Sequence, residues 1–128
     1  MDKMLSKFTV AALLLASSAG VAAYASKPIA DEKIALAKAS LERAEQSGAP
    51  QAAPVELATA RDKLARAEKA NADHEAKPAA LLADQANIDA QVAEAMALQA
   101  RSQKAAMEFD TSMQALRQES ARASQTAQ

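Results

Sequence analysis

Fifty consecutive residues at the carboxyl end of this chain, from Ala79 to Gln128, contain neither proline nor glycine. Proline lacks a backbone N–H and glycine loses the most conformational entropy on ordering, so both types interrupt helices. Alanine, the best helix former and a poor strand former, supplies 30 of the 103 residues that follow Ala25. These features predict an all-α chain that ends in one long helix.

The remaining prolines and Gly48 divide the chain into helices. The predicted helices run from about Ile29 to Gln46, from about Pro54 to Ala72, and from a start between His74 and Pro78 to about Arg117. Pro54 and Pro78 suit the first turn of a helix, where the missing N–H has no intrahelical partner anyway. Asp73 is a candidate cap of the third helix, and we expect the polar residues 118–128 to fray.

Each predicted helix carries a stripe of mostly apolar residues at spacings of three and four. The stripes are Ile34, Ala37, Leu41 and Ala44; Leu57, Ala60, Leu64 and Ala67; and Leu81, Gln85, Ile88, Val92, Ala95, Gln99, Ser102, Ala106, Phe109, Met113 and Leu116. The third stripe keeps a seven-residue repeat throughout, which predicts left-handed, coiled-coil-like packing. We expect an antiparallel helical hairpin or three-helix bundle over residues 26–117.

Charges favour the antiparallel hairpin of the second and third helices. If the chain reverses near Glu75, opposed positions sum to about 150, and Arg66 would face Asp84 while Arg61 would face Asp89. Such exposed pairs contribute only about 0–1 kcal/mol each. The second helix is too short to cover the third beyond about Leu98, so the rest of the stripe would lack a partner in its own chain.

The first 25 residues have the layout of a cleavable secretory signal peptide. Lys3 and Lys7 precede an apolar run from Phe8 to Ala16, and Ala23-Tyr24-Ala25 matches an A-x-A cleavage site. We therefore expect a protein of the periplasm of a Gram-negative bacterium that begins at Ser26. Retention as a membrane anchor is the alternative, although Thr9, Ser17, Ser18 and Gly20 make the segment a poor membrane span.

Composition argues against several classes of function. The residues after Ala25 have 13 basic and 15 acidic side chains and one aromatic, Phe109. Without a strong positive field or aromatic platforms, we expect no binding of nucleic acid or sugar. The polar faces are not rich in Lys or Arg, which disfavours a membrane-surface helix. The absence of cysteine excludes disulfides and a lipid-modified amino terminus.

Residues suited to catalysis or metal binding are scarce. His74 is the single histidine, and it lies between Asp73 and Glu75 in a predicted turn, whereas zinc usually takes three or four ligands, mostly Cys or His. Asp84, Asp89 and Glu94 step by five and do not form a carboxylate pair on a helix. We expect no enzyme activity, no cofactor, no metal and no small-molecule substrate.

Two stretches of the sequence resemble a known family. They are Ala53-Pro54-Val55-Glu56-Leu57-Ala58-Thr59-Ala60-Arg61-Asp62-Lys63-Leu64-Ala65-Arg66-Ala67 and Leu82-Ala83-Asp84-Gln85-Ala86-Asn87-Ile88-Asp89-Ala90-Gln91-Val92-Ala93. The first is similar to the A-P-x-E-L-x-x-A-R-x-K-L-x-x-A opening of the domain-of-unknown-function family 4398. The resemblance implies an exported helical protein of the bacterial envelope. Members are often lipid-anchored or carry a peptidoglycan-binding domain, and these 128 residues contain neither feature.

The hypothesis that follows is a structural or adaptor protein of the cell envelope that acts through helix–helix interactions. We predict that it binds a protein partner, or itself, through Met107, Phe109, Met113 and Leu116. The alternative is a periplasmic chaperone-like protein that binds many unfolded clients. Methionine suits either role because its side chain adapts to irregular surfaces.

Cleavage after Ala25 can be measured directly. The intact mass of the protein from the periplasmic fraction should correspond to a chain beginning at Ser26. Because the cleavage would remove Tyr24 and the chain has no tryptophan, this protein should absorb almost nothing at 280 nm. A mass that includes Met1, or recovery in the membrane fraction alone, would contradict cleavage.

Overall fold

The computed structural model describes residues 19–127 of the chain, with side chains from residue 27 onwards. The described part is all-α, as the alanine content predicts. It comprises α1 (Ala19–Gln46), α2 (Ala49–Ala52), α3 (Pro54–Ala72) and α4 (Ala76–Thr126). Pro54 opens α3 at the position that its missing N–H favours.

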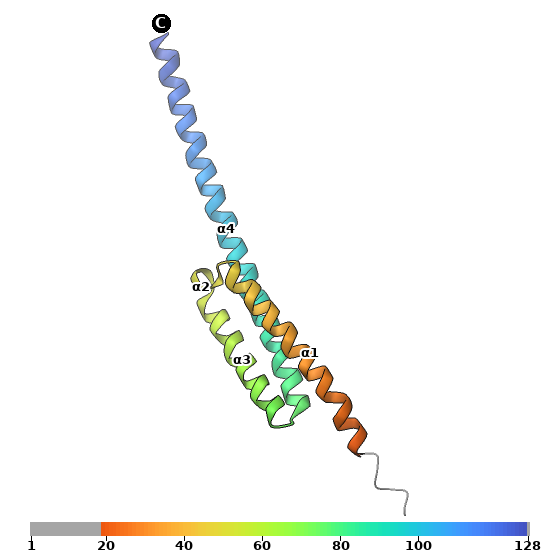
Figure 1. The fold of residues 1–128 in the computed structure, drawn as a ribbon. Helices are drawn as coiled ribbons and strands as arrows, with labels where there is room; N and C mark the ends of the chain where they lie inside the picture. The colour runs from red at the N-terminus through yellow and green to blue at the C-terminus, as the bar shows by residue number, and fades with distance from the viewer. Residues whose placement is uncertain (1–18, 128) are drawn as a thin grey trace, which may run out of the picture.

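The three long helices form an up-down-up arrangement (Figure 1). α1 and α4 run in the same direction, and α3 returns antiparallel to both. α4 packs against both other long helices, which contact each other less extensively. The predicted hairpin of α3 and α4 is confirmed, but α1 lies along α4 as a third member of the bundle.

Alanine side chains make up most of the core of this bundle. Among the buried apolar side chains of residues 27–127, only Ile34, Leu57 and Leu64 are larger than alanine. α4 contributes an unbroken row that we call the alanine seam: Ala79, Ala83, Ala86, Ala90, Ala93 and Ala97. A single methyl group at each position lets α1 and α3 approach α4 closely, toward the short end of the usual interaxial range of about 8–10 Å.

Polar contacts fix how the helices are aligned along their length. Buried Ser40 on α1 donates a hydrogen bond to Asn87 Oδ1 on α4, over 2.6 Å between the oxygens. Arg43 donates to the same serine oxygen, so the hydroxyl has a partner as donor and as acceptor. Lys63 on α3 lies 2.6 Å from Asp89 on α4. Since buried polar groups must be paired, this network penalises sliding of α1 along α4.

The predicted alignment of α3 with α4, in which opposed residue numbers sum to about 150, is close to the observed one. The predicted ion pairs, however, are wrong. Asp89 pairs with Lys63 instead of Arg61. Asp84 pairs with Lys33 of α1. Arg61 and Arg66 turn to Glu45 and Asp62 instead. For Asp84 and Arg61 the reason is that α1 lies beside the hairpin and supplies Lys33 and Glu45 as their partners.

Two residues with positive φ end α1 and α3. Gly48 has φ of 97° and follows α1. His74 has φ of 62° and follows α3. Its N–H donates to the Asn71 carbonyl at 3.1 Å, and the next N–H, of Glu75, donates to Ala70 at 2.8 Å. This pair of bonds is a Schellman motif, in which glycine is the usual residue at the position of His74.

Several predicted boundaries need correction. α1 begins at Ala19 rather than Ile29, with Pro28 inside it. The break before Pro54 contains the short helix α2. Asp73 is the C-cap of α3 and does not cap α4. α4 starts after Glu75 without a side-chain cap. α4 continues past Arg117 to Thr126 because no glycine or proline interrupts it. Fraying of 118–128 in solution stays a prediction.

We expect opposite responses at the two positive-φ positions. Gly48→Ala should lower the free energy of unfolding by about 1 kcal/mol, because an L-residue is strained at this φ although a Cβ would meet no neighbour. His74→Gly should leave it unchanged or raise it. Chemical denaturation followed by circular dichroism measures both. A large loss in His74→Gly would show that the imidazole itself stabilises the turn.

The alanine seam can be tested by overpacking. Ala90 is fully buried, so Ala90→Leu should lower the free energy of unfolding by about 1–3 kcal/mol. Ala100→Leu is the matched control, since Ala100 is exposed on the same helix. The control should change stability by less than about 0.5 kcal/mol. Equal effects at the two positions would contradict close packing at the seam.

Candidate interaction surface on the long helix

α4 carries a second seven-residue repeat on the side opposite the alanine seam. We call it the outer stripe: Leu81, Gln85, Ile88, Val92, Ala95, Gln99, Ser102, Ala106, Phe109, Met113 and Leu116. Leu81 and Ile88 are each 59% exposed, and Val92 is 45% exposed. The expectation that the first half of this stripe packs inside the hairpin is therefore wrong. The alanine side chains of the seam occupy the core, whereas Leu81, Ile88 and Val92 point to solvent.

The bundle covers only the first part of α4. Ala97 is the last buried residue of this helix. The projecting segment, residues 98–126, extends from the bundle as a single helix (Figure 1). At about 1.5 Å per residue it is roughly 43 Å long. Within the described residues, α4 therefore has no partner helix beyond about Leu98. The short length predicted for α3 had indicated this.

Three of the four predicted partner-binding residues share one face of the projecting segment. Phe109 is 64% exposed and Leu116 is 66% exposed. Met113, between them, is partly exposed. Spacings of four and three place these three side chains along one line of the helix. They form the outer half of the outer stripe.

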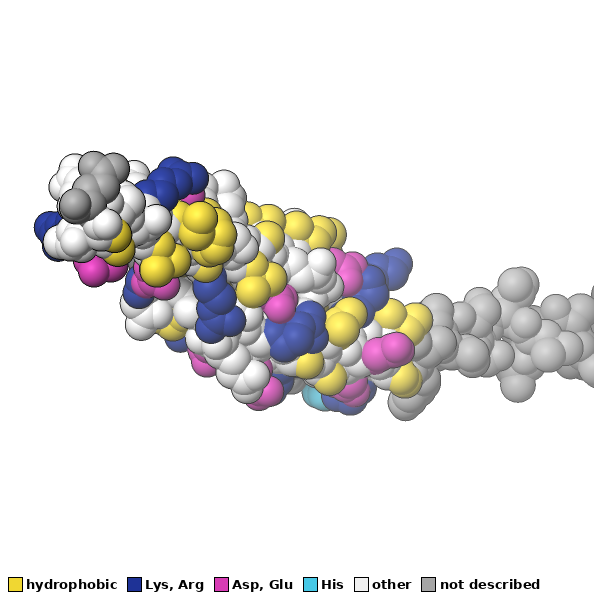
Figure 2. Space-filling model, turned by 90° about the horizontal axis from the view of Figure 1, so that it is seen from above, with side chains coloured by type: hydrophobic (Ala, Val, Ile, Leu, Met, Phe, Trp, Pro, Cys, Tyr) yellow, Lys and Arg dark blue, Asp and Glu magenta, His cyan; other side chains and the backbone are white. Residues whose placement is uncertain are grey.

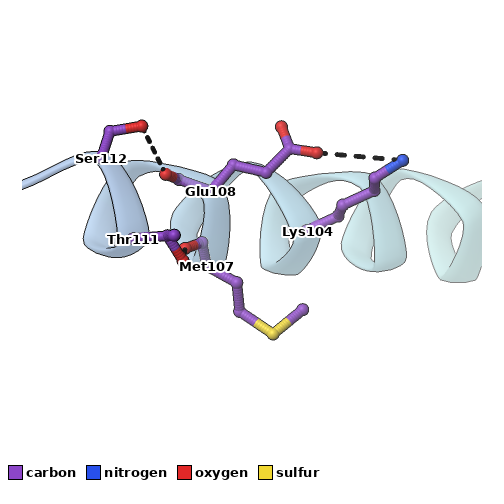
Figure 3. Close-up of a pocket in the computed structure, with 5 residues that line it drawn as sticks. All are labelled: Lys104, Met107, Glu108, Thr111 and Ser112. Carbon is purple, nitrogen blue, oxygen red and sulfur yellow. Dashed lines mark hydrogen bonds and ion pairs between the residues drawn. The ribbon is translucent and has the colours of Figure 1, made fainter. Parts of the chain in front are cut away.

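Met107 lies elsewhere on the helix, although it is as exposed as Phe109. Successive residues are about 100° apart, so a residue two positions before Phe109 points to nearly the opposite side. Figure 3 shows Met107 pointing away from the Lys104–Glu108 ion pair. The residues drawn there all belong to α4. The structure therefore separates Met107 from the other three predicted residues.

Further apolar side chains are exposed on the bundle itself. Ile29 and Leu36 of α1 are each 51% exposed, and both line a shallow surface that also includes Lys33 and Asp84. Figure 2 shows hydrophobic side chains at intervals along one face, interleaved with charged ones. Neither α1 residue belongs to the stripes predicted from the sequence, although a seven-residue spacing relates the two.

The described part of the chain offers little that resembles a reactive centre. Among residues 19–127, no group of three or more His, Cys, Asp or Glu side chains is placed to hold a metal ion. His74 is exposed in its turn. The Asp73 carboxylate accepts a hydrogen bond from Lys69 at 3.0 Å and raises the pKa of that lysine. No helix in the described residues is both long and apolar enough to cross a membrane.

Comparison with known proteins yields one match. The model of the DUF4398 family, a domain of unknown function, matches residues 32–109. No curated protein and no solved structure matches the chain. The matched range includes nearly all of the bundle and extends into the projecting segment as far as Phe109. Because it spans more than half of the sequence, the chain belongs to the DUF4398 family.

Proposed function

We propose that this protein is a non-enzymatic periplasmic component of the bacterial cell envelope, with a structural or adaptor role exercised through helix–helix contacts. The bundle serves as a folded base. The outer stripe on the projecting segment is the surface that binds a protein helix. The observation that carries the proposal is the exposure of Phe109 and Leu116 on a helix that no other described element covers.

The arrangement suits a helical partner better than a small ligand. A seven-residue repeat keeps one line of side chains facing a partner helix over many turns. The outer stripe keeps this repeat through the whole projecting segment as far as Leu116. Large apolar side chains on such a line are the anchors that helix-in-groove recognition uses.

The position of Pro28 supports export with cleavage before Ser26. In the full chain Pro28 lies inside α1, where proline removes a helical hydrogen bond and clashes with the preceding turn. In a chain that starts at Ser26, the same proline would fall in the first turn of the helix. Proline is tolerated there because that N–H has no intrahelical partner.

Site-specific photo-crosslinking in living cells tests the proposed surface. A photoreactive residue at Ala106, on the outer stripe, should capture a small number of proteins that mass spectrometry identifies. The double change Phe109→Asp with Met113→Asp should abolish capture, because desolvating two carboxylates in an apolar contact is costly. Circular dichroism should show that the bundle remains folded.

Met107→Asp is the matched control, since Met107 is exposed to the same extent but faces another way. It should leave capture unchanged. If the double change leaves capture intact, the outer stripe is not the binding surface. Capture of many unrelated, unfolded proteins would instead favour the chaperone-like alternative.

A further inference from the structure

We propose that one occupant of the outer stripe is a second copy of this chain, with the two projecting segments paired antiparallel. This inference rests on the proposed use of the stripe for helix–helix contact and names its partner. The pairing would place Met113 of each copy beside Leu116 of the other copy. Phe109 of each copy would then lie beside Ser120 of its partner.

The length of the projecting segment fits this pairing. With Met113 beside Leu116, the two helices overlap from about residue 103 to residue 126 in each copy. The segment begins at residue 98, just after the last buried alanine, and α4 ends at Thr126. In this register residue 126 of each helix lies opposite residue 103 of the other, outside the part of α4 that the bundle buries. The two bundles lie at opposite ends and do not collide.

Unpaired charges beside the stripe select the antiparallel direction. Asp110 and Arg117 follow Phe109 and Leu116, so both flank the stripe on the same side. Within the described residues neither takes part in an ion pair, whereas Lys104 lies 3.9 Å from Glu108 and Arg122 lies 3.9 Å from Glu119. In the proposed pairing, Asp110 of each copy faces Arg117 of the other. Flanking charges of this kind set the direction of coiled-coil pairing.

Two other arrangements of two copies lack this complementarity. In a parallel, in-register pair, Asp110 would face Ala105 and Arg117 would face Ser112, both uncharged. A longer antiparallel overlap would lay each projecting segment along the Leu81–Val92 part of the other copy. That overlap brings Asp110 beside Asp89, which Lys63 already pairs, and Arg117 beside Leu82, so neither charge gains a new partner.

Exchange of the two charges tests the proposal. Sedimentation equilibrium of the purified protein should reveal a dimer, and Asp110→Arg or Arg117→Asp alone should raise its dissociation constant about tenfold. Each single change replaces two attractive pairs per dimer with two repulsive ones. The double change Asp110→Arg with Arg117→Asp should restore the dissociation constant to within about threefold of the original value.

Arg101→Asp is the matched control, because it changes the net charge equally on another face of the segment. It should have no effect on association, and all variants should keep the same helicity by circular dichroism. A chain that stays monomeric at all concentrations would overturn the inference, while capture of a different protein would leave the proposed function standing. Stronger association of the Asp110→Arg variant would indicate the longer antiparallel overlap, and no effect of this change would indicate parallel pairing. Either result would overturn the proposed pairing of Met113 with Leu116.

Discussion

Close packing of alanine against alanine is the constraint on which the rest of this structure depends. The alanine seam presents only methyl groups to α1 and α3, and Ala37 and Ala67 of those helices pack in one cluster with it. Small side chains bury little apolar area each, so stability requires that the helix axes come close and that contact continues over many turns. A larger side chain at a seam position would separate the helices along their length. The buried positions of α4 are therefore all alanine, and Leu82 packs against the core from a partly buried position.

That exclusion accounts for the exposed surface. Leu81, Ile88 and Val92 would normally be core residues, yet α4 presents them to solvent on the side opposite the seam. The same line of positions continues past the bundle to Phe109 and Leu116. A helix with two apolar faces, of which its own chain covers one, is well suited to bind a second helix. The same packing thus accounts for both the alanine core and the exposed outer stripe.

The polar residues orient the helices, as the charge pattern indicated, although through other pairs than those predicted. Their main effect is alignment, because Ser40 and Asn87 form a hydrogen bond in the bundle while most ion pairs lie at partly exposed positions. Exposed pairs add little stability. His74 also has a structural role, because its positive φ and the backbone hydrogen bonds around it terminate α3.

Local propensity, proline placement and chain length were enough to predict the helical class, the bounds of α3 and the absence of a covering helix over α4 beyond Leu98. Helical periodicity, which is also local, placed Phe109, Met113 and Leu116 on one face. Which face of α4 is buried depends instead on how the helices pack against one another. Two seven-residue repeats compete on this helix, and a ranking by hydrophobicity selects the one with Leu81 and Ile88. Because α1 also packs against α4, three helices must approach one another closely, and they can do so only along their alanine side chains. The alanine repeat is therefore buried, and the repeat with Leu81 and Ile88 is exposed.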